Sequence, residues 1–522
     1  MSSPAVEHDA ILIGSGINSL ACAALLARAG WNVLVLERED ALGGAIRTAE
    51  LSEPGYLHDV FSAWHPLWVG GAAHAELGAD LAEHGLEYLN TDLPTATLFP
   101  DGDSAFLLRS TEANEDELGP EWRAVVETFG ANADLAFGVL GTELWSRDGL
   151  RLALRAYRRL GARGLVEFAG TVLASSRDWL TSTFASERAH GVLAPWVLHT
   201  GLGPDAAGSG FMTQVIGFAV QEGGMPIPRG GGARLVDALV RLIEDHGGSC
   251  QTGRDVTKVL VEDGQARGVR LTGGEELRAG RAVIANVTPT QLYGQLLDGH
   301  EDLGRRFRYG RSEMQIHFAL SEPPRWEGDE RLGRTAIVHL TPGLDGVSRA
   351  VNEAERGLLP AEATVVVGQP LTMDPSRAPA GAGLLWIQLQ ELPWHVKGDA
   401  AGELDTGTGT WTEKLRERYA DRIQARIARH VPNLESAIRK RVTLSPADLQ
   451  AANVNLHQGD PYSGSLALDQ NLLWRPLPAR PGHATPVKGL WQIGASTHPG
   501  PGLGAGSGTL VAQRLLRKGL RR

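Results

Sequence analysis

The sequence predicts an α/β protein that joins a Rossmann-like nucleotide-binding domain, with a parallel sheet and a β-meander, to a substrate domain of antiparallel sheet and helices. Three observations support this fold class. A strand, a glycine-rich turn and a helix follow one another near the N-terminus, short strands separated by glycine turns cluster near residue 260, and a buried strand with a glycine-rich loop lies near the C-terminus. We therefore expect the two ends of the chain to build one nucleotide site together.

The composition is that of an ordinary globular protein of 522 residues, long enough for several domains. Its formal net charge of −11 disfavours a nucleic-acid-binding protein, because neutralising phosphates requires a concentrated basic face. Cys22 and Cys250 are too few for a disulfide framework, so a reducing cytoplasm is the expected compartment. Residues 1–8 lack the features of a secretion signal, and no apolar run is long enough for a transmembrane helix.

The N-terminal loop has the composition and spacing of a dinucleotide-binding turn. A strand-like run over residues 8–13 leads into the sequence GSGINS, and apolar residues then repeat at helical spacing. Gly14 permits the tight turn, Gly16 lets the backbone approach a pyrophosphate, and the helix N-terminus offers amide groups to its charge. Ser19 replaces a third glycine and is small enough for the helix to pack on the strand.

An acidic residue ends the next predicted strand. Residues 31–36 form an apolar run after Gly30, which stands where a helix C-cap belongs, and Glu37 follows. Glu37 lies about 20 positions after Gly14, where a carboxylate accepts hydrogen bonds from an adenosine ribose and repels a 2′-phosphate. A simple glycine turn is the alternative for the loop alone. A strand, a helix, a second strand and an acidic residue in this order together predict dinucleotide binding.

A second glycine pair indicates which dinucleotide is bound. Soon after Glu37 the chain reads GGAIRT over residues 43–48, a pair that a simple NAD domain does not need. The run resembles the two-glycine motif of phytoene desaturase-like (carotenoid dehydrogenase-related) flavoproteins, within the wider amine-oxidase-like superfamily. In that family the loop lies along the ribityl chain and pyrophosphate of FAD. The resemblance therefore implies that Gly43, Gly44 and Arg47 contact FAD.

The resemblance continues in the middle of the chain. Residues 230–239 resemble the family's glycine pair and the amphipathic helix that leads back to the FAD domain. Strands separated by glycine turns then predict the β-meander, over residues 256–261, 268–271 and 276–278. In the family, the residue that Val256 resembles contacts adenine through its backbone. Residues 281–286 resemble the strand that returns to the parallel sheet.

The last match lies at the C-terminal end. Residues 489–500 resemble the family's final strand and flavin-proximal loop, and further glycines open a predicted helix. These glycines, with Gly494, Gly502 and Gly504 among them, place unobstructed amides and a second helix N-terminus where phosphate or flavin can lie. Many related FAD folds carry Gly-Asp in this loop, whereas this chain has Ala495 after the glycine. Any carboxylate bond to the ribityl chain must therefore come from elsewhere.

The matched motifs predict a discontinuous FAD-binding domain and a separate substrate domain. The FAD-binding domain is expected to comprise residues 1–75, 221–295 and 485–522. The substrate domain is expected to comprise a mainly helical part, residues 76–220, and a part with antiparallel strands, residues 296–484. Alternating apolar residues in the second part predict half-buried strands that wall a pocket above the flavin.

One predicted helix is both apolar and basic. Residues 150–172 carry apolar side chains at helical intervals. The opposite face carries Arg151, Arg155, Arg158, Arg159 and Arg163. A basic amphipathic helix can rest on an anionic membrane, and related carotenoid enzymes take their substrate from lipid. A solvated helix face is the simpler interpretation, with peripheral membrane contact as the alternative.

The catalytic residues are the least specific part of the sequence, because a flavin dehydrogenase mainly holds its substrate over the flavin and excludes water. His498 is the first candidate, since its loop is expected to border the flavin and imidazole exchanges protons near neutral pH. His65 is the second. Structural histidines are the alternative for both. Metal-ligand spacing and a Gly-x-Ser-x-Gly nucleophile elbow are absent from the sequence.

The predicted function is that of an FAD-dependent dehydrogenase or desaturase that moves a hydride from an apolar or polyene-like small molecule to flavin N5. An amine-type oxidase is the first alternative, and a non-redox isomerase or saturase is the second. Rab escort and GDP-dissociation-inhibitor proteins resemble the same fold and bind prenylated proteins without flavin chemistry. Their nucleotide motifs are degraded, whereas the glycine loops and Glu37 of this chain are present.

Overall fold

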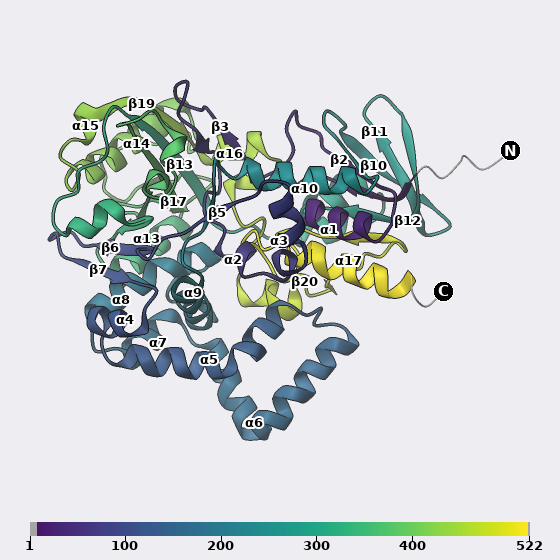
Figure 1. Ribbon diagram of the computed structural model, residues 1–522, viewed down its shortest axis with the longest axis horizontal. Helices are drawn as coiled ribbons and strands as arrows, with labels where there is room; N and C mark the ends of the chain where they lie inside the picture. The colour runs from purple at the N-terminus through teal and green to yellow at the C-terminus, as the bar shows by residue number, and fades with distance from the viewer. Residues whose placement is uncertain (1–7, 520–522) are drawn as a thin grey trace.

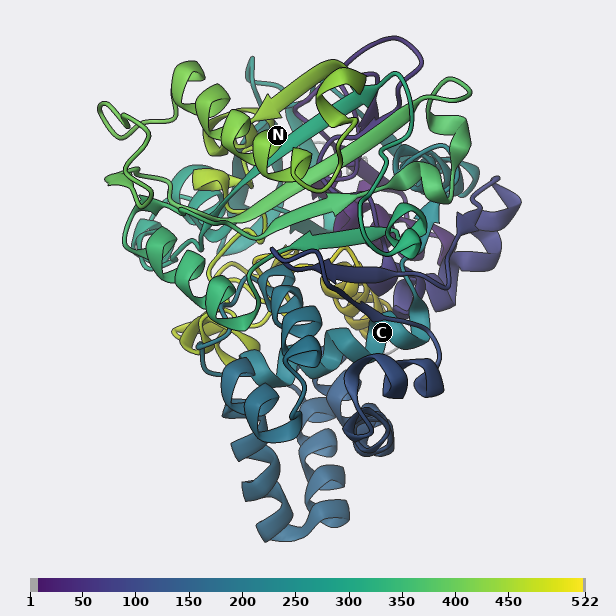
Figure 2. The same ribbon diagram turned by 90° about the vertical axis from the view of Figure 1, so that its left-hand side faces the viewer.

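The computed structural model describes residues 8–519 and contains two large sheets, seen in Figure 1 and Figure 2. Distant parts of the chain build the first sheet. Its parallel strands are β1 (His8–Ile13), β2 (Val33–Leu36), β9 (Ser249–Gln251), the second half of β12 (Glu276–Ala285) and β22 (Leu490–Gln492). Every side chain of β2 and β22 is buried, as is usual where a parallel sheet is covered on both faces. The predicted α/β fold class is confirmed.

The β-meander is continuous with the parallel sheet. β10 (Val256–Glu262), β11 (Gln265–Leu271) and the first half of β12 pair in antiparallel order. β12 then continues beside β1 in parallel order as far as Ala285. The sequence pattern predicts separate strands at 276–278 and 281–286. The structure joins them, because Gly280 stays within the strand rather than forming a turn.

Three helices cover one face of this sheet and bring the chain ends together. α1 (Ile17–Arg28) packs against α10 (Ala233–Asp245) and α17 (Gly506–Gly519), which Figure 1 shows beside it. The contact between α1 and α17 is close: a Cβ at Gly508 would overlap the carbonyl oxygen of Asn18. The Gly508 amide donates to the Asn18 side-chain oxygen at 3.0 Å. Glycine at position 508 is therefore what lets the C-terminal helix lie against the N-terminal one.

The second sheet is mainly antiparallel. Its order is β19 (Ile438–Leu444), β13 (Ser312–Leu320), β17 (Gly383–Leu392), β16 (Val365–Gly368), β14 (Ile337–Leu340), β6 (Thr95–Leu98) and β7 (Ser104–Leu107). Met314, Ile316 and Phe318 alternate along β13 and pack in one hydrophobic core with residues of α14 (Glu413–Ala428). The side chains on the other face of β13 therefore point away from this core, toward the rest of the molecule.

The part of the chain over residues 76–220 is mostly helical, as expected. It contains α4 (Thr111–Leu118), α5 (Glu121–Leu140), α6 (Arg147–Leu173), α7 (Ser176–Thr183), α8 (Glu187–Leu193) and α9 (Ser209–Gly223). It also contributes the hairpin β6–β7 to the second sheet, which the sequence analysis missed because each strand has only four residues. In Figure 1 and Figure 2, α6 projects from the body, bent at Gly161.

The division of the chain into two domains at the predicted bounds stays a proposal. No helix within residues 8–519 is long and apolar enough to cross a membrane. The expectation about a secretion signal concerns residues 1–8, of which 1–7 lie outside the described residues.

Candidate functional site

One cavity of about 590 Å³ connects the two sheets. At the first sheet it is lined by Ile13, Leu36, Asn286 and Ile493, each of which ends or directly follows a parallel strand. The space outside the carboxyl ends of parallel strands is where α/β folds bind their ligands. At the other end the cavity reaches β13, β14 and β17 of the second sheet.

The first glycine loop lies against the end of β12. Gly14 has a φ of +84°, a conformation that residues with a side chain rarely adopt. Gly16 precedes α1 as its N-cap, and a Cβ there would lie 3.0 Å from the side-chain nitrogen of Asn286. Both glycines line the cavity. At these two positions the loop therefore presents backbone, rather than a side chain, to whatever fills this end.

Glu37 joins the two N-terminal glycine loops. Its Oε2 accepts hydrogen bonds from the Ser15 amide at 2.9 Å and from the Ser15 hydroxyl at 2.6 Å, and Oε1 accepts one from the Glu39 amide at 3.0 Å. The Ser15 hydroxyl in turn accepts a bond from the Gly43 amide at 3.0 Å. Glu37 lines the cavity and is otherwise buried. This carboxylate therefore also holds the loops in place, a role that the sequence pattern does not predict.

The second glycine pair completes this end of the cavity. Gly43, Gly44, Arg47 and Val256 all line it. A Cβ on Gly44 would lie 3.1 Å from the Cα of Gly16, so the two glycine loops meet backbone to backbone. A side chain on Gly44 would therefore press against the first loop.

The C-terminal loop closes the cavity from the opposite side. Gly494 has a φ of +112°, and a Cβ there would overlap the Asn286 side chain. The next residue is fixed by Arg475, whose buried guanidinium donates from Nε and Nη2 to the Ala495 carbonyl at 3.1 and 2.6 Å. Gly502 and Gly504 line the cavity just before α17 begins.

These residues fit a flavin dinucleotide. Two helix N-termini, those of α1 and α17, open toward one cavity, and Gly43, Gly494 and Gly502 line it at positions where a Cβ would collide with neighbouring atoms. Helix N-termini and open amides favour an anionic diphosphate. The cavity also continues past the loops, which leaves space for a ring system and a substrate.

Three of the predicted site residues do not line the cavity. Ser19 is buried in α1, and its hydroxyl has no hydrogen-bond partner among the described residues. His65 is buried with Nδ1 3.0 Å from the Tyr88 hydroxyl. His498 is buried, and its carbonyl accepts a bond from Nε2 of His483, whose Nδ1 lies 2.5 Å from Glu143.

Burial also changes the chemistry expected of the two candidate histidines. It lowers the pKa of His65 to about 4 and, together with the nearby His483, lowers the pKa of His498 to about 4. Both rings are therefore neutral near pH 7, and neither is placed to exchange a proton with a molecule in the cavity. Their catalytic roles stay predictions, while this geometry supports packing roles.

The far end of the cavity has two unlike walls. We call the first the polar wall; it lies on β13 and β17 and comprises Glu313, Gln315, Gln388 and Gln390. We call the second the apolar wall; it comprises Trp64, Trp196, Ile216, Val220, Met225 and Trp386. The Trp64 and Trp386 rings meet edge to face with centroids 5.4 Å apart. A ligand here meets both aromatic rings and polar side chains, a carboxyl group among them.

The polar wall is not among the predicted site residues, although the sequence carries a signal for it. In the run SEMQIHFAL the apolar residues alternate with Glu313, Gln315 and His317, which places the three polar residues on one face of the strand. Polar residues on the second face of a strand usually indicate solvent. Here that face is buried; Glu313 and Gln315 line the cavity, and His317 packs against the ring of His58.

Glu313 is the acidic group of this end. Gln315 Nε2 donates to its Oε1 at 2.5 Å and Gln388 Nε2 donates to its Oε2 at 2.7 Å. Burial raises the pKa of Glu313 to about 7, although the two amide bonds act in the opposite direction. Burial lowers the pKa of the cavity-lining His199 to about 3, and burial raises that of Tyr462 well above its usual range.

Comparison with known proteins agrees with the geometry. The family model for flavin containing amine oxidoreductases matches residues 20–516. The chain is 28% identical over 560 residues to pyridine nucleotide-disulfide oxidoreductase domain-containing protein 2 of Rattus norvegicus, covering 98% of this chain and 94% of the relative. It is 25% identical over 529 residues to the neurosporene-forming phytoene desaturase of Cereibacter sphaeroides, covering 96% and 93%.

Among solved structures, an oxidoreductase from Methanosarcina mazei has a TM-score of 0.58 and 16% identity, covering 97% of this chain and 99% of that one. This likeness concerns the fold alone. The family model, by contrast, spans nearly the whole chain. The protein is therefore an oxidoreductase with FAD as its cofactor, and it belongs to the flavin containing amine oxidoreductase family.

Proposed function

We propose that the protein oxidises an apolar or polyene-like small molecule by transferring a hydride from it to FAD. The observation that carries the proposal is the single cavity that joins the glycine loops to the apolar wall. Bound FAD supplies a two-electron acceptor at N5 for the hydride. The phytoene desaturase relative supports a hydrocarbon substrate. The aromatic rings of the apolar wall suit such a substrate, because burying apolar surface contributes about 25 cal/mol per Å².

The residues of the chain would divide the work between cofactor and substrate. We propose that Gly14, Gly16 and Gly44 hold the diphosphate, and that Glu37 accepts from the adenosine ribose. The remaining predicted contacts to FAD are Ser19, Gly43, Arg47, Val256, Gly494, Gly502 and Gly504. The apolar wall would exclude water and orient the substrate, which is most of what a hydride transfer requires of a protein.

An anaerobic substrate screen tests this function. Purified protein is expected to carry FAD with its visible absorbance, and phytoene in detergent is expected to bleach it in the absence of oxygen. Bleaching by putrescine but not by phytoene would assign an amine-type oxidase instead. Colourless protein that cannot be reconstituted with FAD would refute flavin chemistry altogether.

The substrate also has to reach the cavity, and we propose that α6 contacts an anionic membrane for this purpose. Most exposed large apolar side chains of the described residues lie on or beside this helix: Phe137, Trp145, Leu150, Leu154, Tyr157, Val166, Leu173, Leu473 and Trp474. The helix carries six arginines and two acidic residues in a protein of net charge −11. Figure 2 shows that the helix projects from the body of the molecule. A basic helix with exposed apolar residues suits an anionic bilayer surface.

Vesicle flotation tests the membrane contact. We expect binding to vesicles containing phosphatidylserine and not to those of phosphatidylcholine alone, and we expect loss of binding in a Leu150→Ser, Val166→Ser double variant. Val261→Ser is the matched control, because Val261 is an exposed apolar residue on β10. A double variant that floats normally would refute the contact. A double variant that alters oligomeric state instead would assign α6 to self-association.

A further inference from the structure

Glu313 is held by neutral groups, unlike the buried acidic residues Asp59 and Asp374. Its carboxyl oxygens accept from the amides of Gln315 and Gln388, and no cation lies within ion-pair distance among residues 8–519. By contrast, Asp59 and Asp374 are both paired with the buried guanidinium of Arg377. A carboxylate kept for structure is usually paired in that way, because an uncompensated buried charge is costly. Glu313 is therefore free to gain or lose a proton.

Glu313 is the group at the far end of the cavity whose protonation is expected to change near neutral pH, because the ionisable groups that face it do not titrate there. Tyr462 lies on the loop beside β13 and stays protonated, because burial and the nearby Glu313 raise its pKa. Asp460 on the same loop is fixed by the amides of Gly310, Tyr462 and Gly464 and does not line the cavity. His199 lines it, but burial lowers its pKa to about 3, so it is a weak base.

We propose that Glu313 is the catalytic base of the oxidation, accepting the proton that the substrate releases when its hydride leaves. This inference rests on the proposed function, hydride transfer to FAD. The substrate loses one hydrogen with both electrons of its C–H bond, as a hydride to the flavin. It loses the neighbouring hydrogen as a proton to the Glu313 carboxylate. The electron pair of that second bond becomes the new double bond of the product.

The two amide bonds and the placement on β13 suit this role. Gln315 and Gln388 hold the carboxyl group in one orientation, and a fixed base needs little reorganisation during the reaction. A base is most effective when its pKa lies near the working pH. The pKa of Glu313, raised by burial to about 7, meets that condition.

The first test is the rate at which a substrate identified in the anaerobic screen reduces the flavin. Stopped flow measures this rate in the absence of oxygen. The wild-type rate is expected to rise with pH through about 7, as Glu313 loses its proton. Glu313→Gln keeps the size of the side chain but cannot accept a proton. Its FAD content should be unchanged, its rate at pH 8 should fall at least about a hundredfold, and the rise with pH should disappear.

Glu391 provides a matched control on the neighbouring strand β17. It is also buried, and burial raises its pKa to about 7. It accepts hydrogen bonds from the amide and hydroxyl of Thr364, and it does not line the cavity. Glu391→Gln should therefore keep the wild-type rate and pH profile. A similar loss of rate in both variants would indicate general damage to the sheet and overturn the proposal.

A second readout needs no turnover. Infrared spectroscopy detects the carbonyl band of a protonated carboxyl group. In Glu391→Gln protein this band reports on Glu313, and in Glu313→Gln protein it reports on Glu391. Limonene, a neutral hydrocarbon probe, should displace water from the cavity and raise the midpoint of the Glu313 band by on the order of one pH unit. The Glu391 band should not respond.

The outcomes separate this inference from the proposed function. If limonene does not shift the midpoint of the Glu313 band, or if the flavin of Glu313→Gln protein is reduced at the wild-type rate, the assignment of the base is overturned. Hydride transfer to FAD would remain as proposed. Protein without FAD, or flavin that no compound of the screen reduces, refutes the proposed function. In that case a limonene response would still place Glu313 at the ligand, but as a binding group rather than a base.

Discussion

Ser15 is the residue through which the two N-terminal glycine loops share one hydrogen-bond network. Its hydroxyl donates to Glu37 and accepts from the Gly43 amide, while its backbone amide also donates to Glu37. A hydrogen bond to a charged group contributes about 1.5–3 kcal/mol. The position of one glycine loop relative to the other therefore depends on one small side chain.

We expect Ser15→Ala to weaken FAD binding about tenfold, because the Gly43 amide loses its partner and Glu37 loses one of its donors. Titration of apoprotein with FAD measures the effect. Ser19→Ala is the control, since Ser19 is equally buried in the same segment but its hydroxyl has no partner and does not line the cavity. Equal losses in the two variants would contradict the role given to Ser15, and a loss in Ser19→Ala alone would support the predicted contact of Ser19 with FAD.

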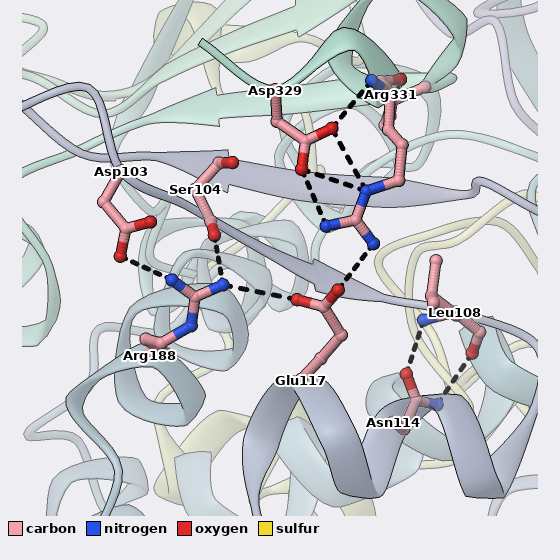
Figure 3. Close-up of polar contacts among 9 residues, drawn as sticks. Asp103, Ser104, Leu108, Asn114, Glu117, Arg188, Asp329 and Arg331 are labelled. Atoms are coloured by element: carbon pink, nitrogen blue, oxygen red, sulfur yellow. Dashed lines mark hydrogen bonds and ion pairs between the residues drawn. The ribbon is translucent and has the colours of Figure 1, made fainter.

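At the scale of elements, an ion-pair network fastens the helical region to the second sheet. Figure 3 shows Glu117 of α4 between Arg188 of α8 and Arg331, which follows Asp329. The N–O distances are 3.3 Å to Arg188 and 2.5 Å to Arg331. The Arg331 guanidinium also lies over the ring of Phe106 in β7, 3.9 Å from its centroid. The Glu117 side chain is only 13% exposed, so solvent screens these pairs weakly.

Glu117→Gln should loosen α4 and α8 without affecting the FAD site. The variant keeps the size of the side chain but removes the charge shared by two guanidinium groups, at a cost of about 1–3 kcal/mol. Hydrogen exchange of α4 and α8 should speed up, while that of α1 stays unchanged. Glu112→Gln is the control, because the Glu112 carboxylate on the same helix is 76% exposed in its pair with Arg123. Unchanged exchange in α4 would show that the network is dispensable.

At the scale of the whole molecule, buried histidines dominate the response to acid. Burial lowers the pKa of six of them: His58, His65, His199, His317, His339 and His498. Their ordinary pKa is 6.5; burial lowers the pKa of His339 well below this value and that of the other five to between about 3 and about 4. The unfolded chain therefore binds protons first, and the stability these residues contribute is complete above pH 6.5 and is lost as the pH falls toward 4.

Two buried glutamates act in the opposite direction. Burial raises the pKa of Glu313 and Glu391 to about 7, so the stability that they contribute is complete below pH 4.5 and is lost as the pH rises through 7. Because the histidines outnumber them, we expect the unfolding temperature to fall between pH 7 and pH 5. Calorimetry with excess FAD measures this, and His317→Gln should reduce the difference. An equal or higher unfolding temperature at pH 5 would contradict the expectation that the histidines outweigh the two glutamates.

The sequence by itself determined the parallel sheet, the meander and the residues of the nucleotide end. Gly14, Gly16, Glu37 and the glycine pair at 43–44 lie close together along the chain, and their spacing is fixed by local strand, turn and helix geometry. All of them line the cavity. The Ser15 contacts were not read from the sequence, because they require the exact distance between two loops.

The tertiary structure decided the far end of the cavity. Glu313 meets Gln388 only because β13 and β17 pair in one register, and a slip of one strand by one residue would turn its side chain to the opposite face. The same long-range packing turned His65 toward Tyr88 and kept His498 out of the cavity, although the loops of both residues reach it. Which face of a strand or loop meets a ligand depends on partners far away in the chain, and local spacing does not encode them.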